Sequence, residues 1–219
     1  MIKAIIFDMD GTVLNTIDDI HQAVNHALAL KKLPLKSLDE VKMAVGNGAR
    51  KLIERVCPKH FTKEELNEVF HLYQSYYDQH SNVHTGPYEG ILELLETLKS
   101  KGFKLAVVSN KFEHLVQGLN DEVFKHLFDA SIGEVHGIPI KPAPDMVYKA
   151  LNLLDVKPEE ALFVGDSEVD IDTANNAQII SVGVTWGFRP ESLLREHQAH
   201  YIIHEPKALL DLIKGVNTK

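Results

Sequence analysis

Short apolar runs recur along this chain and alternate with longer segments in which apolar and polar residues are mixed. The first run, Ala4-Ile5-Ile6-Phe7, is rich in β-favouring side chains and stops at Asp8. Comparable runs follow at residues 105–108, 161–164 and 179–182, with a weaker one at 201–203. A short run that is apolar on both faces is typical of a central parallel strand that helices cover. The runs therefore predict the strands of a buried parallel sheet.

Helical periodicity occupies the segments between these runs in the second half of the chain. Apolar residues between 91 and 98 follow the i, i+3, i+4, i+7 spacing, and Gly102 stands where a helix C-cap belongs. The same spacing recurs over residues 146–154, directly behind Pro144. Strands and helices that alternate in this way predict an α/β fold whose core is a doubly wound, Rossmann-like parallel sheet.

Residues 16–83 break the alternation, because helical patterns follow one another there without a strand-like run. The apolar stripes lie at residues 20–28, 41–45, 52–56 and 64–79. Successive helices inserted after the first strand predict a small helical domain of its own. We expect a core domain built from residues 1–15 and 84–219, with an inserted helical domain at residues 16–83.

Composition and charge narrow the class of partner. Of 219 residues, 44% are hydrophobic and 25% charged, as in ordinary globular proteins. The 23 Lys and Arg residues against 31 Asp and Glu residues give a net charge of −8, which disfavours nucleic acid. A single cysteine, Cys57, excludes an internal disulfide and a thiolate metal site. Without an apolar stretch of ~20 residues or a signal-like start, we expect a cytoplasmic protein that binds no membrane. Its expected assembly is a monomer or a homodimer.

Polar residues stand directly after three of the predicted strands. In chain order they are Asp8 and Asp10, Ser109 and Asn110, and Asp166 and Ser167. One strand that ends in Asp or Ser usually marks only a turn or a helix cap. In an open parallel sheet, however, ligands bind outside the carboxyl ends of the strands. Three such ends therefore predict a shared crevice.

The turn after the first strand carries the most specific chemistry. Gly11 permits the backbone to bend, so that the carboxylates of Asp8 and Asp10 can project into the same cleft. Like charges this close repel and need a cation or a shared proton. Oxygen ligands without Cys or His favour Mg²⁺. Asp170 would share a helix face with Asp166, although these two acids are also typical of an N-cap and a first helical turn.

The order of these residues resembles the four motifs of the haloacid dehalogenase superfamily of phosphatases. The motifs correspond to Phe7-Asp8-Met9-Asp10-Gly11-Thr12, Val107-Val108-Ser109-Asn110-Lys111, Lys141-Pro142-Ala143-Pro144-Asp145 and Val164-Gly165-Asp166-Ser167-Glu168-Val169-Asp170. The resemblance extends over essentially the whole chain. One departure is Asn15-Thr16, which stands where the family usually has Asp-Ser.

The resemblance implies a phosphatase that works through an aspartyl phosphate. Asp8 would be the nucleophile, and Asp10 would protonate the leaving group and later accept a proton from water. Mg²⁺ would be held by the side chains of Asp8 and Asp166 and by the backbone carbonyl of Asp10, with Asp170 supporting the site. Phosphoryl transfer depends mainly on positioning and electrostatic stabilisation, which suits such residues.

Three further residues would serve the phosphoryl group in the same scheme. Ser109 would donate a hydrogen bond to a phosphoryl oxygen, and Asn110 beside it would belong to the substrate site. Lys141 would neutralise charge on the nucleophile and on the phosphate. The alternative for Lys141 is an ordinary solvated lysine on the surface.

The helical insertion at residues 16–83 resembles the cap domain of this family, which covers the catalytic core. Within it, the segment from residue 45 to residue 50 resembles the cap loop of phosphoglycolate phosphatases. The resemblance implies that the backbone of Gly46, Asn47 and Gly48 approaches a small anionic substrate. Arg50 would then bind a carboxylate of that substrate. The alternative is a plain interhelical turn that carries a surface arginine.

The leading hypothesis is a Mg²⁺-dependent phosphatase for a small phosphomonoester such as 2-phosphoglycolate. A pyrophosphatase of the same superfamily stays open, because the motifs do not exclude it. A sugar phosphomutase stays open too, although its subfamily usually carries Asp-Gly-Val where this chain has Asp10-Gly11-Thr12. A non-enzymatic phospho-accepting signalling domain also gathers acids, Ser or Thr and Lys at strand ends. Such domains are shorter, and they have no use for a helical insertion.

Overall fold

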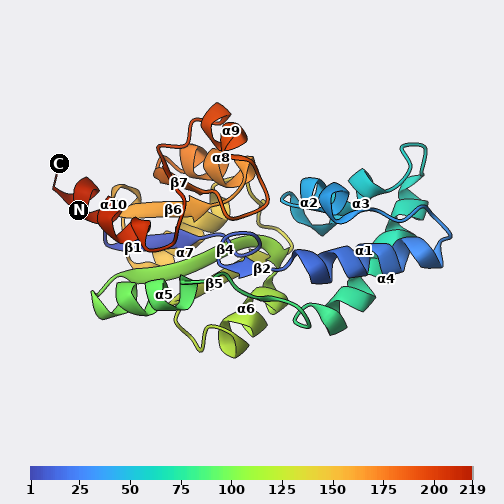
Figure 1. The fold of residues 1–219 in the computed structure, drawn as a ribbon, viewed down its shortest axis with the longest axis horizontal. Helices are drawn as coiled ribbons and strands as arrows, with labels where there is room; N and C mark the ends of the chain where they lie inside the picture. The colour runs from blue at the N-terminus through green and yellow to red at the C-terminus, as the bar shows by residue number, and fades with distance from the viewer. Residues whose placement is uncertain (219) are drawn as a thin grey trace.

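A computed structural model describes residues 1–218, and its larger sheet has six parallel strands. The strands are β1 (Ala4–Phe7), β4 (Lys104–Phe112), β5 (Ala130–Glu134), β6 (Ala161–Gly165), β7 (Ile180–Val184) and β8 (Tyr201–Ile203). They lie in the order β5-β4-β1-β6-β7-β8, so the first strand of the chain runs through the middle (Figure 1). This arrangement confirms the predicted α/β fold with a doubly wound parallel sheet.

Side chains of β1 alternate between two buried faces of the sheet. Ile5 and Phe7 belong to one apolar cluster, and Ala4 and Ile6 belong to another. Burial of all four side chains favours this strand at the centre, where helices cover both faces. The helices on the Phe7 face are α5 (Ile91–Ser100), α6 (Glu113–Glu122) and α10 (Ala208–Asn217), and those on the Ile6 face are α7 (Asp145–Leu154) and α8 (Glu168–Asn176). Two short helices, η1 (Pro158–Glu160) and α9 (Glu191–Glu196), complete this part of the chain.

The register of the three central strands brings their carboxyl ends to one edge of the sheet. Phe7, the last residue of β1, pairs with Val107 of β4 and with Val164 of β6. Because the strands are parallel and in step, the chain leaves all three at the same level. The polar residues that follow there are Asp8, Ser109 and Asp166.

Two features of the sheet differ from the sequence prediction. Strand β5 is absent from the predicted set, because Ala130–Glu134 mixes two apolar side chains with serine, glycine and glutamate. Strand β4 is longer than predicted and continues through residues 109–111 to Phe112. Lys111 therefore lies on the strand, and not in a loop beyond it.

The helical insertion predicted after the first strand is present. Its helices are α1 (Ile17–Leu30), α2 (Leu38–Ala44), α3 (Gly48–Val56) and α4 (Lys63–His80). They share an apolar cluster of their own, which also takes in Leu115 and Phe188 from outside the insertion. Figure 1 shows the four helices together, at the end of the molecule opposite the two chain termini. Within residues 1–218 no helix combines the length and apolarity needed to cross a membrane.

A short antiparallel ribbon marks the place where the chain enters and leaves the insertion. Strand β2 (Leu14–Asn15) pairs there with β3 (Gly86–Pro87). The buried carboxylate of Asp19, in the first turn of α1, accepts hydrogen bonds from the backbone N–H groups of residues 83–85 at 2.9–3.1 Å. One side chain thus joins the outgoing and returning segments, close to the predicted boundaries at residues 15 and 84.

Candidate active site

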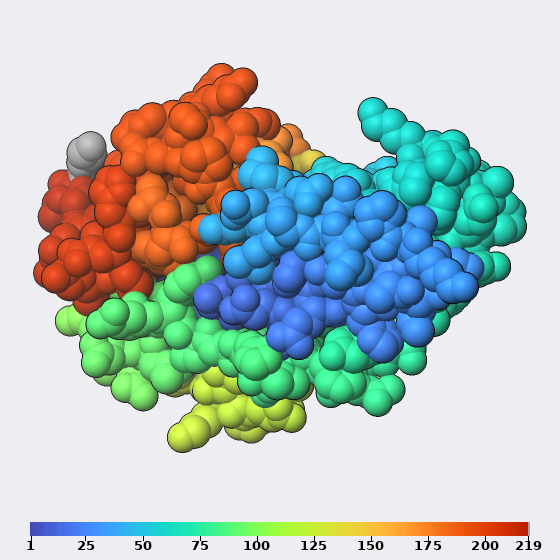
Figure 2. Space-filling model, turned by 45° about the vertical axis from the view of Figure 1, so that its right-hand side comes forward, coloured from blue at the N-terminus to red at the C-terminus, as the bar shows by residue number. Residues whose placement is uncertain are grey.

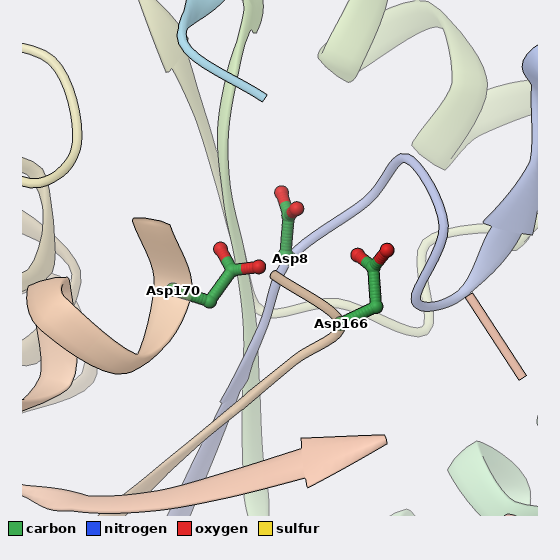
Figure 3. A group of neighbouring side chains, drawn as sticks. All are labelled: Asp8, Asp166 and Asp170. Carbon is green, nitrogen blue, oxygen red and sulfur yellow. The ribbon is translucent and has the colours of Figure 1, made fainter. Parts of the chain in front are cut away.

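Three carboxylates meet at the edge of the sheet where the central strands end. Asp8 follows β1, Asp166 follows β6, and Asp170 lies in the first turn of α8. Figure 3 shows their carboxylates gathered on one side of the strand ends. One oxygen of each lies within 4.8 Å of the others, and the three residues are 8%, 1% and 0% exposed respectively. The predicted gathering of these acids is therefore present in the fold.

A buried lysine holds two of these carboxylates. The Nζ atom of Lys141 is 2.8 Å from Asp8 Oδ1 and 2.7 Å from Asp170 Oδ1. Lys141 is only 2% exposed, so the alternative of a solvated surface lysine is wrong. Burial by itself would lower the pKa of Lys141, but the charges of Asp170 and Asp8 raise it above its ordinary value. Lys141 therefore stays positively charged beside Asp8.

Hydrogen bonds fix the carboxylates of Asp166 and Asp170 in place. Asp166 accepts one from the Thr12 hydroxyl at 3.1 Å and one from the Phe188 backbone N–H at 2.7 Å. Asp170 accepts from the backbone and hydroxyl of Ser167 at 3.0 and 2.7 Å. These bonds belong to an N-cap at Ser167, so Asp166 precedes α8 and does not share a helix face with Asp170 as predicted.

Gly11 makes the close approach of the first and fourth motifs possible. Its φ angle is +85°, and a Cβ atom there would lie 2.4 Å from Asp166 Oδ2. Any larger residue would meet both a strained backbone and a clash with the carboxylate. The predicted bend is therefore present, with a second reason for glycine that the sequence did not reveal.

The three buried carboxylates share the positive charge of Lys141, which pairs with Asp8 and Asp170. Burial raises the pKa of Asp8 well above its ordinary value, and the charges of Asp170 and Asp166 add to the effect against that of Lys141. Burial also raises the pKa of Asp166 to about 7, with Asp170 again contributing. A divalent cation would offset this repulsion, and a donor set made only of oxygen fits Mg²⁺. The residues present therefore suit the predicted metal.

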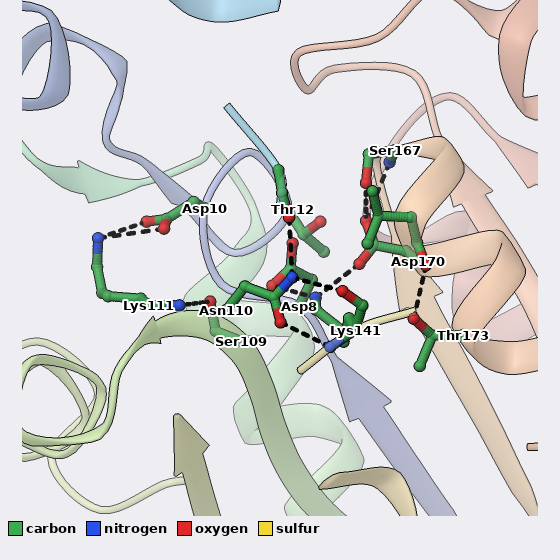
Figure 4. A network of polar contacts seen from close by, with 12 residues as sticks. Asp8, Asp10, Thr12, Ser109, Asn110, Lys111, Lys141, Ser167, Asp170 and Thr173 are labelled. Atoms are coloured by element: carbon green, nitrogen blue, oxygen red, sulfur yellow. Dashed lines mark hydrogen bonds and ion pairs between the residues drawn. The ribbon is translucent and has the colours of Figure 1, made fainter. Parts of the chain in front are cut away.

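Asp10 faces a second buried cation. The Nζ atom of Lys111 is 2.9 Å from Asp10 Oδ1 and 3.1 Å from Asp10 Oδ2. It also donates a hydrogen bond of 2.5 Å to the Tyr77 hydroxyl, on helix α4 of the insertion. Figure 4 shows this pair on one side of Asp8 and the Lys141–Asp170 pair on the other. Asp8 and Asp10 thus form ion pairs with two different lysines, Lys141 and Lys111.

The two polar residues of the second motif differ in their contacts. Ser109 is buried at the cavity wall, and its hydroxyl accepts a hydrogen bond from the Lys111 backbone N–H at 3.3 Å. The Asn110 side chain donates to the backbone carbonyls of Gly46 and Lys141, each at 3.0 Å. It also accepts from the Lys141 backbone N–H at 2.8 Å. These contacts suit a positioning role for Asn110 better than the predicted contact with substrate.

The residues predicted in the loop between α2 and α3 divide into two groups. Gly46 and Gly48 line the cavity, whereas Asn47 and Arg50 do not. Asn47 accepts a hydrogen bond from Arg55 at 2.6 Å. The exposed Arg50 donates to Asn67 at 3.0 Å, and its guanidinium lies 4.2 Å from the centre of the Phe70 ring. This geometry does not support the predicted carboxylate-binding role of Arg50 and agrees with the alternative of a surface arginine.

Most of these groups line one small cavity of about 60 Å³, but Asp170, Asn47 and Arg50 do not. Sequence reasoning missed four of its polar lining residues, which are Tyr73, Tyr77, Lys111 and Arg189. Lys111 had a signal, because it directly follows the predicted Ser109 and Asn110. The two tyrosines lie on the apolar stripe of α4 and looked like ordinary core residues.

Arg189 is a buried arginine that joins the insertion to the rest of the chain. Its Nε atom donates to Glu168 at 2.9 Å. Its terminal nitrogens donate to the carbonyls of Lys42 and Val45, at 2.7 and 2.6 Å, and to that of Met43 at 3.3 Å. Figure 2 shows the blue segment of the insertion resting against the orange C-terminal part of the chain. No sequence signal marked this residue.

Comparison with known proteins places the chain among hydrolases. Residues 5–184 match the family model described as haloacid dehalogenase-like hydrolase. A phosphoglycolate phosphatase from Aquifex aeolicus is 39% identical over 189 residues, which make up 85% of this chain and 86% of that protein. The pyrophosphatase PpaX of Anoxybacillus flavithermus is 30% identical over 219 residues, or 100% of this chain and 99% of that protein.

A solved structure agrees with these matches. A Lactobacillus delbrueckii subsp. bulgaricus protein, described as a candidate phosphoglycolate phosphatase, superposes with a TM-score of 0.92 and 36% sequence identity. The match covers 96% of this chain and 98% of that one. The similar proteins thus carry two different substrate names, phosphoglycolate and pyrophosphate.

Proposed function

Because the chain belongs to the haloacid dehalogenase-like hydrolases, as its four motifs predicted, we propose that it is a Mg²⁺-dependent phosphatase for a small phosphomonoester. The observation that carries the proposal is the meeting of three buried carboxylates with the ammonium of Lys141 at the cavity wall. A nucleophile, a charge-neutralising lysine and a cation site lie together there. This is the inventory that phosphoryl transfer needs.

The metal would be held by the side chains of Asp8 and Asp166 and by the backbone carbonyl of Asp10. When bound, it would supply positive charge that offsets the negative charge of the phosphoryl oxygens and of the nucleophile. Asp170 supports this site through Lys141, which it holds at 2.7 Å. Ser109 would donate its hydroxyl hydrogen to a phosphoryl oxygen.

The reaction would proceed in two displacements at phosphorus. In the first, an Asp8 carboxylate oxygen bonds to phosphorus, the bond from phosphorus to the alcohol oxygen breaks, and Asp10 gives that oxygen its proton. In the second, water bonds to phosphorus, Asp10 takes up a water proton, and the bond to Asp8 breaks. Inorganic phosphate leaves, and both side chains return to their starting states.

We further propose that residues 16–83 act as a cap over a core formed by residues 1–15 and 84–219. Both parts supply walls of the cavity, for example Tyr77 from the first and Ser109 from the second. Because the cavity is small and has walls from both parts, we infer that the substrate is a small ester and not a phosphoprotein. The names of the relatives favour 2-phosphoglycolate as substrate, with pyrophosphate as the second candidate.

The replacement of Asp8 by Asn tests the proposed function. An amide is a poor nucleophile but matches the carboxylate in size, so Asp8→Asn should fold and lose at least about 1000-fold in kcat. Phosphate release from 2-phosphoglycolate and from an aryl phosphate gives the measurement. Asp18→Asn, at an exposed position in the same chain, is the matched control and should leave both rates unchanged. Activity of Asp8→Asn within tenfold of the parent protein would exclude Asp8 as nucleophile.

A further inference from the structure

A substrate that carries a second anionic group needs a cation in the cavity beyond those that serve the phosphoryl group. Among the described residues that line the cavity, the cationic side chains are Lys111, Lys141 and Arg189. Lys141 is committed to Asp8 and Asp170 at 2.8 and 2.7 Å. The candidates for the second group are therefore Arg189 and Lys111.

The guanidinium of Arg189 has little capacity left for a ligand. It donates to the Glu168 carboxylate and to three backbone carbonyls at the end of α2. These four acceptors engage all three of its nitrogen atoms, which together carry five N–H groups. A ligand would have to displace part of the contact between α2 and α8. Arg189 therefore has a structural role, and the binding of a substrate group to it would break some of these contacts.

Lys111 is placed differently. Its side chain is 3% exposed and reaches from β4 to the carboxylate of Asp10. Its Nζ atom is 2.9 Å from Asp10 Oδ1, but its hydrogen bond goes to Oδ2 at 3.1 Å. With the bond to Tyr77, two of the three N–H groups of the ammonium are engaged, and the third is left for a ligand. The proposed reaction brings Asp10 to the leaving oxygen. An anionic group one or two bonds beyond that oxygen therefore comes within reach of Lys111 Nζ.

Tyr77 adds a neutral donor beside this ammonium. Its hydroxyl accepts a hydrogen bond of 2.5 Å from Lys111, so the phenol proton can be donated to a further acceptor. Burial raises the pKa of Tyr77 above its ordinary value, which keeps that proton on the phenol. The Lys111 Nζ atom also lies 4.8 Å from the centre of the Tyr77 ring. A hydrogen-bonded ammonium and a phenol side by side are suited to a carboxylate or phosphate oxygen.

We propose that Lys111 and Tyr77 bind the second anionic group of the substrate and set the preference for doubly anionic esters. The inference rests on the proposed phosphatase function and names a feature of its substrate. It assigns to Lys111 the role that the sequence resemblance gave to Arg50. Because Tyr77 belongs to α4 and Lys111 to β4, the subsite is complete only when the insertion sits over the sheet edge.

The test compares two substrates that differ in one charge. They are 2-phosphoglycolate and its carboxamide analogue, which has the same size and a closely similar leaving alcohol. Lys111→Met keeps an unbranched side chain of nearly the same length and removes its charge. It should lower kcat/KM for 2-phosphoglycolate about 10- to 100-fold more than for the carboxamide, the range expected for a charge-assisted contact. Lys101→Met, at an exposed position, is the matched control and should change neither value.

A second variant covers the case in which Lys111→Met fails to fold. Tyr77→Phe removes only the hydroxyl and should lower kcat/KM for 2-phosphoglycolate several-fold more than for the carboxamide. Pyrophosphate, assayed in parallel, shows whether a phosphate can replace the carboxylate at this subsite. An equal loss on the charged and neutral substrates would overturn the proposal, because Lys111 would then act only through Asp10. A parent protein that hydrolyses none of the phosphates would instead contradict the proposed function.

Discussion

At the scale of single residues, the site relies on charged side chains that are almost fully buried. Lys141 and Asp170 are 2% and 0% exposed, yet each is paired or hydrogen-bonded through several contacts. Removal of one partner from such a pair leaves an uncompensated buried charge, which costs about 3–5 kcal/mol. A variant that neutralises one of these groups but keeps its shape is therefore informative only when its folding is measured together with its activity.

Asp10 is the residue whose role such a substitution can isolate. Asp10→Asn keeps the backbone carbonyl and the size of the side chain but removes the proposed proton carrier. We expect a loss of about 10²–10⁴-fold in kcat/KM for alkyl phosphates, whose leaving groups need a proton. The loss should be at least tenfold smaller for aryl phosphates, which leave readily without one. A series of phosphate esters graded by leaving-group pKa provides the measurement, and a uniform loss across it would assign Asp10 a structural role.

At the scale of the elements, the position of the insertion depends on a few polar contacts. Asp19 connects the start of α1 to the chain that returns from α4. Arg189 satisfies carbonyl groups at the C-terminal end of α2, where a helix leaves its last carbonyls without internal partners. Leu115 and Phe188 add apolar contact with the helices of the insertion. Arg189 therefore also fixes the start of the loop that contributes Gly46 and Gly48 to the cavity.

Removal of that arginine should destabilise the protein much more than removal of an exposed one. Arg189→Met would leave Glu168 and the α2 carbonyls without their donor, and should lower the free energy of unfolding by about 2–3 kcal/mol. Arg195→Met is the matched control, because Arg195 also pairs with a glutamate, Glu191, but is 65% exposed. Its effect should stay below about 1 kcal/mol. Urea unfolding of both variants gives the comparison, and equal effects would contradict the structural role of Arg189.

At the scale of the whole molecule, the folded chain brings together negative charge that the unfolded chain keeps apart. Asp8, Asp166 and Asp170 come from two distant parts of the sequence and share one buried site. Ionisation of these groups therefore opposes folding wherever no cation is bound. Stability should depend on both pH and divalent metal, with the sign fixed by the direction of the pKa shifts.

In metal-free protein, the folded state raises the pKa of Asp166 to about 7, whereas an unfolded aspartate titrates near about 4. The folded state thus binds the proton more tightly, so this group's contribution to stability falls as pH rises from about 4 to about 7. Mg²⁺ binds the ionised form and should offset the fall. We expect the rise in Tm on replacing EDTA with Mg²⁺ to be larger at pH 8 than at pH 5.

The control for this prediction is Asp166→Asn, which removes the titrating group. The variant should show a smaller rise in Tm with Mg²⁺ and a weaker dependence of that rise on pH. Thermal unfolding followed by circular dichroism is sufficient for both proteins. A rise in Tm that is the same at pH 5 and pH 8 in the parent protein would contradict the proposed cation site.

The sequence by itself determined the framework of this protein. The apolar runs identified five of the six strands of the sheet, and the helical stripes identified the four helices of the insertion. These signals are local, because the burial of a strand or of one face of a helix requires apolar residues at regular positions within a short stretch of sequence. The acids at the strand ends were equally evident, since parallel strands deliver their carboxyl ends to one edge whatever the details of packing.

Only the tertiary structure decided which side chains share the cavity. Lys111 meets Tyr77 across 34 positions of the sequence, and Arg189 meets Val45 across 144. Such pairs depend on where the insertion rests over the sheet, and periodicity within an element carries no information about that placement. Arg50 was predicted in the site for the same reason. Its position in a loop that resembles a known cap loop did not reveal that its side chain contacts Asn67 and Phe70. A linear pattern specifies which residues must be buried, whereas contact across elements follows from three-dimensional packing.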